Sequence, residues 1–430
     1  MRTPFLSLLC VTPLLCETIP LRLSRPAELV AELRMRSPGS DWSRAERAAA
    51  VVTLRLEGKS PHYVTLFAGP EPRTYAVFLG ELAAGEHRLI LERDPKWSAP
   101  ESRFELLSVR FREYRPGDPD YLLVAHAPVV YARQDTLGRF SDVPLTAYCE
   151  RLEEGGRRLL QFSMIFSNED GGTSTRALMA RWGRTTDIEY LYRVYLDGAG
   201  RPARTTIQTR DHKEVDFQGA SEGLHPLLYV VTRNNMVAGE GPATLRYQLA
   251  PRLVDLSRAS RELVMDEDPV LNRVAAQELR RENKLRPFGT VRAENISDPR
   301  NYLYLEMKLD NRDSAAAALV RLEGEDLWRS SNLGRSDYAI SRSGWVRTTI
   351  ELPPGTRPER IAEIGFQCLV IPQKVNGKDL WPEAGLCRLE AVRRCFLLDE
   401  DYRPGPDVWS TPAGWKPLEI PSGEIRVFRR

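Results

Sequence analysis

Short alternating segments dominate the hydrophobic pattern of the first hundred residues. Val52, Leu54 and Leu56 alternate with polar neighbours, and further runs have the length of a strand: 63–67, 75–79, 87–91 and 104–111. Turn residues, among them Gly69-Pro70 and Asp94-Pro95, separate these runs. Alternation between turns predicts half-buried strands. We therefore expect an N-terminal β-sandwich over residues 19–113, with a hairpin connection at 80–85.

A linker rich in Pro, Gly and Asp, residues 114–120, precedes a second β-rich block. The strand-like runs of this block are 121–131, 159–167, 188–196, 224–232 and 244–249. Along 159–167, Phe162 and Met164 fall on one face, whereas Gln161 and Ser163 fall on the other. This pattern is typical of a sheet with one buried side. It predicts a central β-sandwich over residues 121–251.

The hydrophobic period changes after Arg252. Asp255 or Ser257 can cap a short helix that runs to Met265, and Asp268-Pro269 begins a longer one with apolar residues at helical spacing. We therefore expect a helical connection over 252–290. Strand-like runs then resume at 302–309, 317–322, 346–352, 364–371 and 386–394. They predict a C-terminal β-rich domain over 291–430, whose tail, 404–430, lies across the surface.

The predicted fold class is mainly β, with several β-sandwich domains and a short helical connection between the central and C-terminal parts. The 430 residues suit about two to four domains. Lys and Arg number 61 against 59 Asp and Glu, which gives a net charge of +2, and no basic block stands out. This balance gives no reason to expect a nucleic-acid partner.

The N-terminus has a basic residue, Arg2, followed by an apolar run from Phe5 to Cys16. This order is typical of a secretory signal, and the run is too short to span a bilayer, so we expect no transmembrane segment. Residues 1–18 thus predict a signal peptide and an extracytoplasmic or secreted protein. The alternatives are a buried apolar N-terminus and a cytoplasmic protein.

Four cysteines lie beyond the predicted signal: Cys149, Cys368, Cys387 and Cys395. An even number is compatible with disulfides in an oxidising compartment. By proximity in the sequence, Cys387 and Cys395 are the expected bridge. Four buried thiols are the alternative, because a chain of this length has no need of cross-links.

The segment from Gly183 to Leu196 holds the candidate chemistry. From Ile188 onward, apolar side chains alternate as in a half-buried strand, so Asp187 and Glu189 are expected to project together from its other face. Two carboxylates on one face need a cation, arginine partners or water. The arginine alternative is open because Arg181, Arg184 and Arg193 surround the motif.

The string from Gly183 to Glu189 and the later His225-Pro226 strand resemble the necrosis- and ethylene-inducing-peptide-like proteins within residues 128–237. That family has a G-H-R-H-D-W-E heptapeptide on a β-sandwich. Its members are secreted, bind a divalent cation and act on sphingolipid headgroups. Here Gly183, Asp187 and Glu189 match the heptapeptide, whereas Arg184 and Thr186 replace its histidines and Ile188 replaces its tryptophan.

The resemblance also implies an acidic residue upstream of the heptapeptide, a position that Asp170 can fill. Oxygen ligands from Asp170, Asp187 and Glu189 would suit Ca²⁺ or Mg²⁺. Addition of His225 or His212 would favour Mn²⁺ or Zn²⁺. The sequence therefore predicts a metal site at Asp170, Asp187, Glu189 and His225, with a hydrogen-bonded structural role as the alternative for His225.

No nucleophile elbow, phosphate-binding loop, dinucleotide fingerprint or zinc-protease helix is present in the sequence. We therefore expect a protein of binding or interaction type, with a divalent cation and a glycan or lipid headgroup as ligand. A hydrolase acting on glycans or lipid headgroups is the first alternative, because its two carboxylates come from separate strands and leave no local motif. A structural or assembly protein without a small-molecule site is the second.

Overall fold

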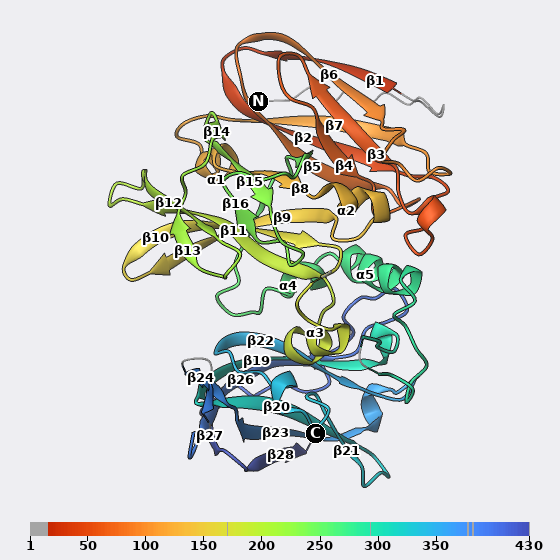
Figure 1. The fold of residues 1–430 in the computed structure, drawn as a ribbon, viewed down its shortest axis with the longest axis vertical. Helices are drawn as coiled ribbons and strands as arrows, with labels where there is room; N and C mark the ends of the chain where they lie inside the picture. The colour runs from red at the N-terminus through yellow and green to blue at the C-terminus, as the bar shows by residue number, and fades with distance from the viewer. Residues whose placement is uncertain (1–15, 170, 293, 376–377, 381, 430) are drawn as a thin grey trace. The chain divides into compact units, whose positions relative to one another are not determined.

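The computed structural model describes residues 16–169, 171–292, 294–375, 378–380 and 382–429. The chain forms two compact units, which we describe separately (Figure 1). Unit 1 holds residues 1–172 and 186–255, and unit 2 holds residues 173–185 and 256–430. The first two predicted β-rich blocks thus share unit 1, and most of the predicted helical connection belongs to unit 2. The predicted domain boundaries themselves stay a prediction.

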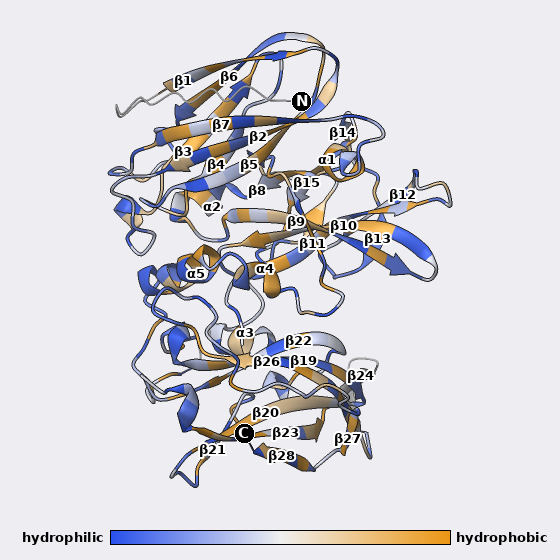
Figure 2. Cartoon of the chain, turned by 180° about the vertical axis from the view of Figure 1, so that it is seen from behind, coloured by the Kyte–Doolittle hydropathy of each residue, from blue (hydrophilic) through white to orange (hydrophobic). Residues whose placement is uncertain are grey.

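The first part of unit 1 contains two antiparallel sheets. One has the order β1-β6-β3-β4, and the other has the order β5-β2-β7. Their bounds are Cys16–Leu23 (β1), Ala27–Arg36 (β2), Val51–Leu56 (β3), His62–Thr65 (β4), Arg73–Leu82 (β5), Gly85–Arg93 (β6) and Glu105–Tyr114 (β7). Hydrophobic and hydrophilic residues alternate along β2 and β7, as Figure 2 shows. The alternation that predicted these strands is therefore present in the folded sheets.

The hairpin predicted at 80–85 is wrong. β5 pairs with β2, whereas β6 pairs with β1 and β3, so the turn at Ala83-Ala84 carries the chain from one sheet to the other. Two glycines close to a short turn indicate that the chain reverses. They do not determine whether the next strand joins the same sheet, because that depends on which apolar faces pack together.

The second part of unit 1 contains a six-stranded sheet, β13-β12-β11-β10-β9-β18, and a smaller sheet, β14-β15-β8-β17, in which β16 also pairs with β15. The strands of the first are Pro144–Glu154 (β9), Arg157–Phe166 (β10), Asp187–Leu196 (β11), Pro202–Gln208 (β12), Glu214–Asp216 (β13) and Arg252–Val254 (β18). Those of the second are Val129–Ala132 (β8), Ser221–Glu222 (β14), His225–Val230 (β15), Val237–Ala238 (β16) and Leu245–Tyr247 (β17).

One predicted strand of this part is wrong at its start. The run expected at 121–131 begins with a short helix, α1 (Tyr121–Ala125), and only its end forms β8. Leu122 to Ala125 carry no helix breaker, and Pro128 ends the helical segment, because the residue before a proline avoids the helical conformation. A second short helix, α2 (Gln134–Arg139), follows β8.

Backbone hydrogen bonds connect the two parts of unit 1. Phe78 N donates to Gln248 O at 3.0 Å, and Ala250 N donates to Ala76 O at 2.9 Å. The segment that follows β17 therefore pairs with the edge of β5, next to the bridge between Val77 and Leu249. This pairing brings the N-terminal sheets against β15 and β17.

Unit 2 contains a sandwich of two antiparallel sheets, β22-β19-β26-β27 and β21-β20-β23-β28, and a two-stranded sheet, β24-β25. The strands are Tyr302–Arg312 (β19), Ser314–Leu322 (β20), Trp328–Ser330 (β21), Gly344–Glu351 (β22), Ile361–Val370 (β23), Gln373–Val375 (β24), Lys378–Leu380 (β25), Leu386–Phe396 (β26), Leu418–Pro421 (β27) and Ile425–Arg429 (β28). The tail expected to lie across the surface supplies β27 and β28, so it completes both sheets.

The helices of unit 2 are α3 (Thr175–Trp182), α4 (Leu263–Asp266) and α5 (Val270–Arg281). The last two confirm the change of period after Arg252. Short 3₁₀ turns complete the described helical segments of the chain: Ala45–Arg47, Pro299–Asn301, Ser336–Tyr338 and Pro358–Arg360. Helix α3 docks on β22, where the Thr348 and Thr349 hydroxyls donate to the carbonyls of Ala180 and Met179.

Gly183 ends α3 in the left-handed conformation, with φ of +63°. A Cβ at this position would lie 2.7 Å from Cγ of Arg347, so only glycine fits there. This local role explains the glycine of the heptapeptide-like string. The string is also divided, because Gly183 to Thr185 belong to unit 2 and Asp187 begins β11 in unit 1.

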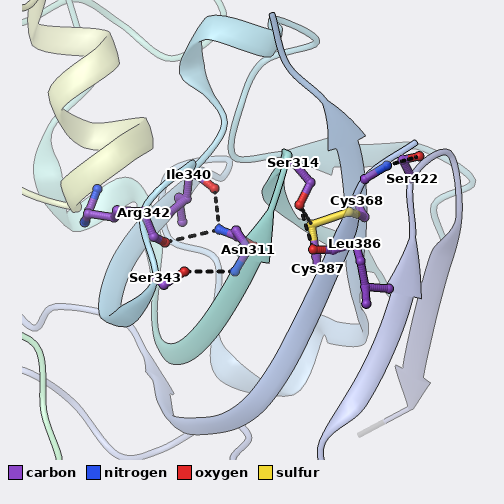
Figure 3. Close-up of a disulfide and its surroundings, with 10 residues drawn as sticks. Asn311, Ser314, Ile340, Arg342, Ser343, Cys368, Leu386, Cys387 and Ser422 are labelled. Atoms are coloured by element: carbon purple, nitrogen blue, oxygen red, sulfur yellow. Dashed lines mark hydrogen bonds between the residues drawn. A yellow bond between two sulfur atoms is a disulfide. The ribbon is translucent and has the colours of Figure 1, made fainter. Parts of the chain in front are cut away.

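A disulfide joins Cys368 on β23 to Cys387 on β26, and therefore links the two sheets of the unit 2 sandwich (Figure 3). The bridge expected between Cys387 and Cys395 is wrong. Both residues lie on β26, and an extended strand rises about 3.3 Å per residue, which holds their sulfurs far apart. Cys395 is a free, buried thiol.

The mainly β fold class, with several sandwich-like sheets and a short helical segment between the central and C-terminal strands, is confirmed. Buried apolar side chains from both sheets of unit 2 form one continuous core, in which Leu305, Val320 and Phe366 are among the members. Within the described residues, no helix combines the length and the apolar character needed to cross a membrane.

Candidate functional site

A β-bulge changes the predicted faces of β11. Tyr190 pairs with Ser163 and Tyr192 pairs with Phe162, so Leu191 is an extra residue on this strand. An extra residue reverses the alternation beyond it. Asp187 and Glu189 therefore share a face with Tyr192 and Val194, instead of opposing them. The predicted alternation of 188–196 is wrong for this reason, although the two carboxylates do lie on one face.

Asp187 is buried within a network of polar side chains. It is 1% exposed, and its Oδ2 accepts a hydrogen bond of 3.0 Å from Nδ2 of Asn235. The same amide donates to Oδ1 of Asp142 at 3.2 Å, and Asp142 also pairs with Arg133 at 2.6 Å. One amide group thus bridges two buried carboxylates. Burial of charged groups requires such partners, so the network supports a structural role for Asp187.

Glu189 takes part in a second, more exposed group. Gln208 Nε2 lies 3.4 Å from Oε2 of Glu189 and 3.0 Å from Nδ1 of His212, whose Nε2 lies 3.4 Å from the amide of Asn234. A neutral imidazole accepts through only one nitrogen, so one of the two amides must present its oxygen to His212. The structure therefore connects His212 to Glu189 through Gln208.

The predicted metal residues do not all meet within the described structure. Asp170 lies outside the described residues. His225 has Nδ1 2.8 Å from Ala127 O and Nε2 3.1 Å from Oε2 of Glu28. No group of three Cys, His, Asp or Glu side chains that could hold a metal ion occurs among the residues that the structure describes. The divalent cation at Asp170, Asp187, Glu189 and His225 stays a prediction.

Two of the arginines around the motif, Arg184 and Arg193, have acidic partners of their own. Arg184 pairs with Glu262 at 3.0 Å in unit 2, where both side chains are buried. Arg193 pairs with Glu214 at 2.6 Å and with Glu154 at 3.1 Å, and its guanidinium also lies over the Tyr190 ring. That last contact, between residues three apart on a strand, is a further consequence of the bulge at Leu191.

The ring of His225 borders a polar cavity of about 140 Å³ in unit 1. Residues from β2, β5, β15 and β17 are among those that surround it, because the segment that follows β17 pairs with β5. Buried side chains line its interior, and exposed residues stand at its mouth. The charged and polar residues that line it are Glu28, Lys59, Ser60, His62, Glu81, Glu222, His225, Arg246 and Gln248.

Glu28 and His225 form a buried pair in this wall. Nδ1 of His225 faces the Ala127 carbonyl, which can only accept, so Nδ1 carries a hydrogen. Nε2 faces Oε2 of Glu28 at 3.1 Å. Phe78 stacks on the imidazole with ring centroids 4.4 Å apart and holds the ring in this orientation. Both nitrogens of His225 are thus engaged.

Two further histidines are buried close to this pair. Burial, and then the positive charge of Arg246, lower the pKa of His62 to about 3. Burial, and then His225, lower the pKa of His126 to about 4. Both imidazoles are therefore neutral at physiological pH. Nε2 of His62 and both nitrogens of His126 are buried without a hydrogen-bond partner in the described part of the chain. Only His62 lines the cavity.

Arg246 and Glu222 form the second charged pair of the wall. Two hydrogen bonds of 2.7 and 2.5 Å join the guanidinium to both carboxylate oxygens. These bonds hold the pKa of Glu222 below its usual value. Arg246 also donates to Gln248 and to the Tyr131 hydroxyl. A guanidinium held on three sides is rigid, which suits the wall of a binding site.

Sequence reasoning identified only His225 among the residues of this cavity. The other residues lie on separate strands and turns, and no local motif marks them: Glu28, Lys59, His62 and Arg246. A charged residue inside an otherwise apolar strand is the one available signal. Arg246, between Leu245 and Tyr247 in β17, shows it, whereas Glu28 does not, because β2 carries further charged residues such as Glu32 and Arg34.

The chain matches no family model and no curated protein. Solved structures show weak, partial likenesses. NLPPya in complex with mannosamine is 11% identical with a TM-score of 0.23, and covers 42% of this chain and 85% of its own. The same protein with glucosamine has a TM-score of 0.24 at equal identity and coverage.

A ruminal GH26 endo-β-1,4-mannanase is 10% identical with a TM-score of 0.17, and the match covers 33% of this chain and 28% of that enzyme. Likenesses this distant say nothing of what this chain binds. They agree with a weak, partial resemblance to the necrosis- and ethylene-inducing-peptide-like fold, and with no closer relationship.

Proposed function

We propose that this chain is a binding protein that takes one sugar ring, free or at the end of a glycan, into the cavity beside His225. The observation that carries the proposal is the convergence of side-chain donors and acceptors from Glu28, His62 and Gln248 around one concave space. Binding sites for small molecules are concave and fix their ligand with a few converging polar groups.

The size of the cavity limits the ligand. Its volume of about 140 Å³ is close to the roughly 150 Å³ that admits one benzene molecule in an engineered protein cavity. A single ring with hydroxyl groups therefore fills it, and the rest of a longer glycan would extend through the mouth at Lys59, Ser60 and Gly223, which are exposed.

The chemistry of the wall favours binding over hydrolysis. A hydrolase needs a base or an acid that is free to reach the substrate. Both ring nitrogens of His225 are engaged, and Glu222 is held by Arg246 through both oxygens. Nε2 of His62 has no partner among the described residues, but the low pKa of this histidine, about 3, makes it a weak base. Groups held by their neighbours orient a ligand and do not transfer protons to it.

The experiment is a titration of purified protein with a panel of monosaccharides, in which calorimetry and saturation-transfer NMR measure binding. Ser60→Trp places an indole at the mouth of the cavity, and Glu57→Trp places one on the same exposed turn away from it. We expect at least one sugar to bind, Ser60→Trp to remove binding and Glu57→Trp to retain it. The proposal is overturned if no sugar of the panel binds, or if Ser60→Trp binds as the wild type does.

We also propose that the chain works in an oxidising, extracytoplasmic compartment. The disulfide between Cys368 and Cys387 supports this address, because disulfides persist where thiols are not kept reduced. Fractionation of the source cells tests it. Recovery of the chain in the cytoplasm, with both thiols reduced, would contradict the proposal.

A further inference from the structure

The charges on the cavity wall are not evenly matched. Glu28 is paired with His225, and Glu222 is paired with Arg246. Lys59 differs, because its Nζ donates to the backbone carbonyl of Glu81 at 3.1 Å and forms no ion pair within the described residues. Lys59 and Glu81 are both exposed, so solvent screens both charges in part.

The backbone holds the Lys59 ammonium over the cavity. Gly80 lies beneath it, and a Cβ on this glycine would be 3.4 Å from Nζ of Lys59 and 3.8 Å from Nε2 of His225. The φ of Gly80 is +75°, in the left-handed region that glycine adopts without strain. The ammonium and the imidazole edge of His225 therefore border the same small space.

We propose that the cavity selects an acidic sugar, one with a carboxylate on its ring, and that Lys59 is the ion-pair partner of that carboxylate. This proposal rests on the proposed function, because it names the class of sugar for the same cavity. In the Glu28–His225 and Arg246–Glu222 pairs, each carboxylate already has a partner on the wall. A single negative charge on the ligand would therefore pair with Lys59. A positively charged amino sugar would be disfavoured beside Lys59, because like charges repel.

Lys59 is suited to this role by its position. Its side chain enters from an exposed turn between β3 and β4, so the ammonium loses only part of its hydration. Its hydrogen bond to Glu81 O uses one of three donors, and two remain for a carboxylate. An ion pair with an exposed ammonium strengthens binding by about twofold to fivefold relative to a neutral partner.

The test compares glucuronate with glucose, which differ by a carboxylate in place of a hydroxymethyl group, and adds glucosamine as a cationic probe. Calorimetric titrations are run on the wild type, on Lys59→Gln and on Lys96→Gln. Lys96 is an exposed lysine that does not line the cavity, and therefore serves as the matched control. All titrations are repeated at high salt.

We expect the wild type and Lys96→Gln to bind glucuronate about twofold to fivefold more tightly than glucose, and to bind glucosamine weakest. Lys59→Gln should remove this preference and leave glucose affinity within about twofold, and high salt should reduce it in the wild type. Equal binding of glucuronate and glucose, or a preference that persists in Lys59→Gln, overturns the role of Lys59 and leaves the sugar-binding proposal standing. Failure of all three sugars to bind overturns the acidic-sugar proposal, and the sugar-binding proposal is overturned as well if no other sugar of the panel binds.

Discussion

The disulfide of unit 2 allows its contribution to the stability of this unit to be predicted. It closes a loop with a sequence separation of 19 between Cys368 and Cys387, and it joins strands from the two facing sheets. In the chain-entropy model, opening a loop of this length destabilises the folded state by about 3 kcal/mol, because the unfolded chain gains freedom. Reduction should therefore lower the free energy of unfolding of unit 2 by about that amount.

Urea denaturation with and without reductant measures this change. Trp409 and Trp415 pack against the core of unit 2, whereas Trp42 and Trp97 belong to unit 1. The part of the fluorescence transition that shifts with reductant therefore reports on unit 2. We expect reductant to shift its unfolding to lower urea, and Cys368→Ala/Cys387→Ala to abolish the response to reductant. Cys395→Ala is the matched control, because Cys395 is buried and free, and this variant should keep the full response.

Peptide mapping under non-reducing conditions gives the decisive outcome. A Cys368–Cys387 cross-linked peptide agrees with the structure, whereas a Cys387–Cys395 peptide refutes it. An unfolding curve of the wild type that reductant leaves unchanged would also refute the reasoning, since the bridge would then contribute no stability. Burial raises the pKa of the Cys395 thiol, so this thiol should resist alkylation in the folded protein.

Two further predictions concern titratable groups of unit 1. The folded-state pKa values of His62 and His126, about 3 and about 4, lie below the usual 6.5. Below pH 6.5 the unfolded chain therefore binds more protons than the folded chain does, and the free energy of unfolding falls as the pH is lowered. Lowering the pH from 7.5 to 5 should reduce the free energy of unfolding by about 2 kcal/mol for each histidine. Urea denaturation of the wild type and of His62→Phe between pH 7.5 and 5 measures the contribution of His62. Equal dependence of stability on pH in the two proteins would contradict the prediction. Asp187→Ala leaves the Asn235 amide short of an acceptor and should destabilise unit 1 by about 1–3 kcal/mol. If instead Asp187 binds a divalent cation, added Ca²⁺, Mg²⁺ or Mn²⁺ should raise the wild-type melting temperature and leave that of Asp187→Ala unchanged; a wild-type melt insensitive to all three would end the metal hypothesis.

Periodicity alone predicted most of the strands, because each has one face in a core. β3, β6 and β10 lie where alternation placed them, and α5 begins directly after Asp268-Pro269. The faces of β11 were not predictable in the same way. The run Tyr190-Leu191-Tyr192 is apolar at every position, so nothing in the sequence marks Leu191 as an extra residue. Only the pairing with β10 shows the bulge.

The candidate metal site was predicted from a local motif and a later histidine, and Asp187 and His225 have separate partners in the structure. Asp187 is held by Asn235, which also has a left-handed φ of +55°. His225 is held by Glu28, which lies 197 positions away in the sequence. A local motif contains no information about partners this distant, because they are brought together by the packing of whole sheets.

The cavity has its origin in the same long-range packing, and this explains why analysis of one predicted domain at a time could not find it. Glu28, Lys59 and Gly80 come from the predicted N-terminal domain, whereas Glu222, His225 and Arg246 come from the predicted central one. The hydrogen bonds between Phe78 and Gln248 bring these two groups together. Since Gln248 also accepts from Arg246, the contact that joins the two parts orients the guanidinium that holds Glu222. The binding wall is therefore complete only when both parts have folded against each other, and any ligand that fills the cavity stabilises that arrangement over the separate parts.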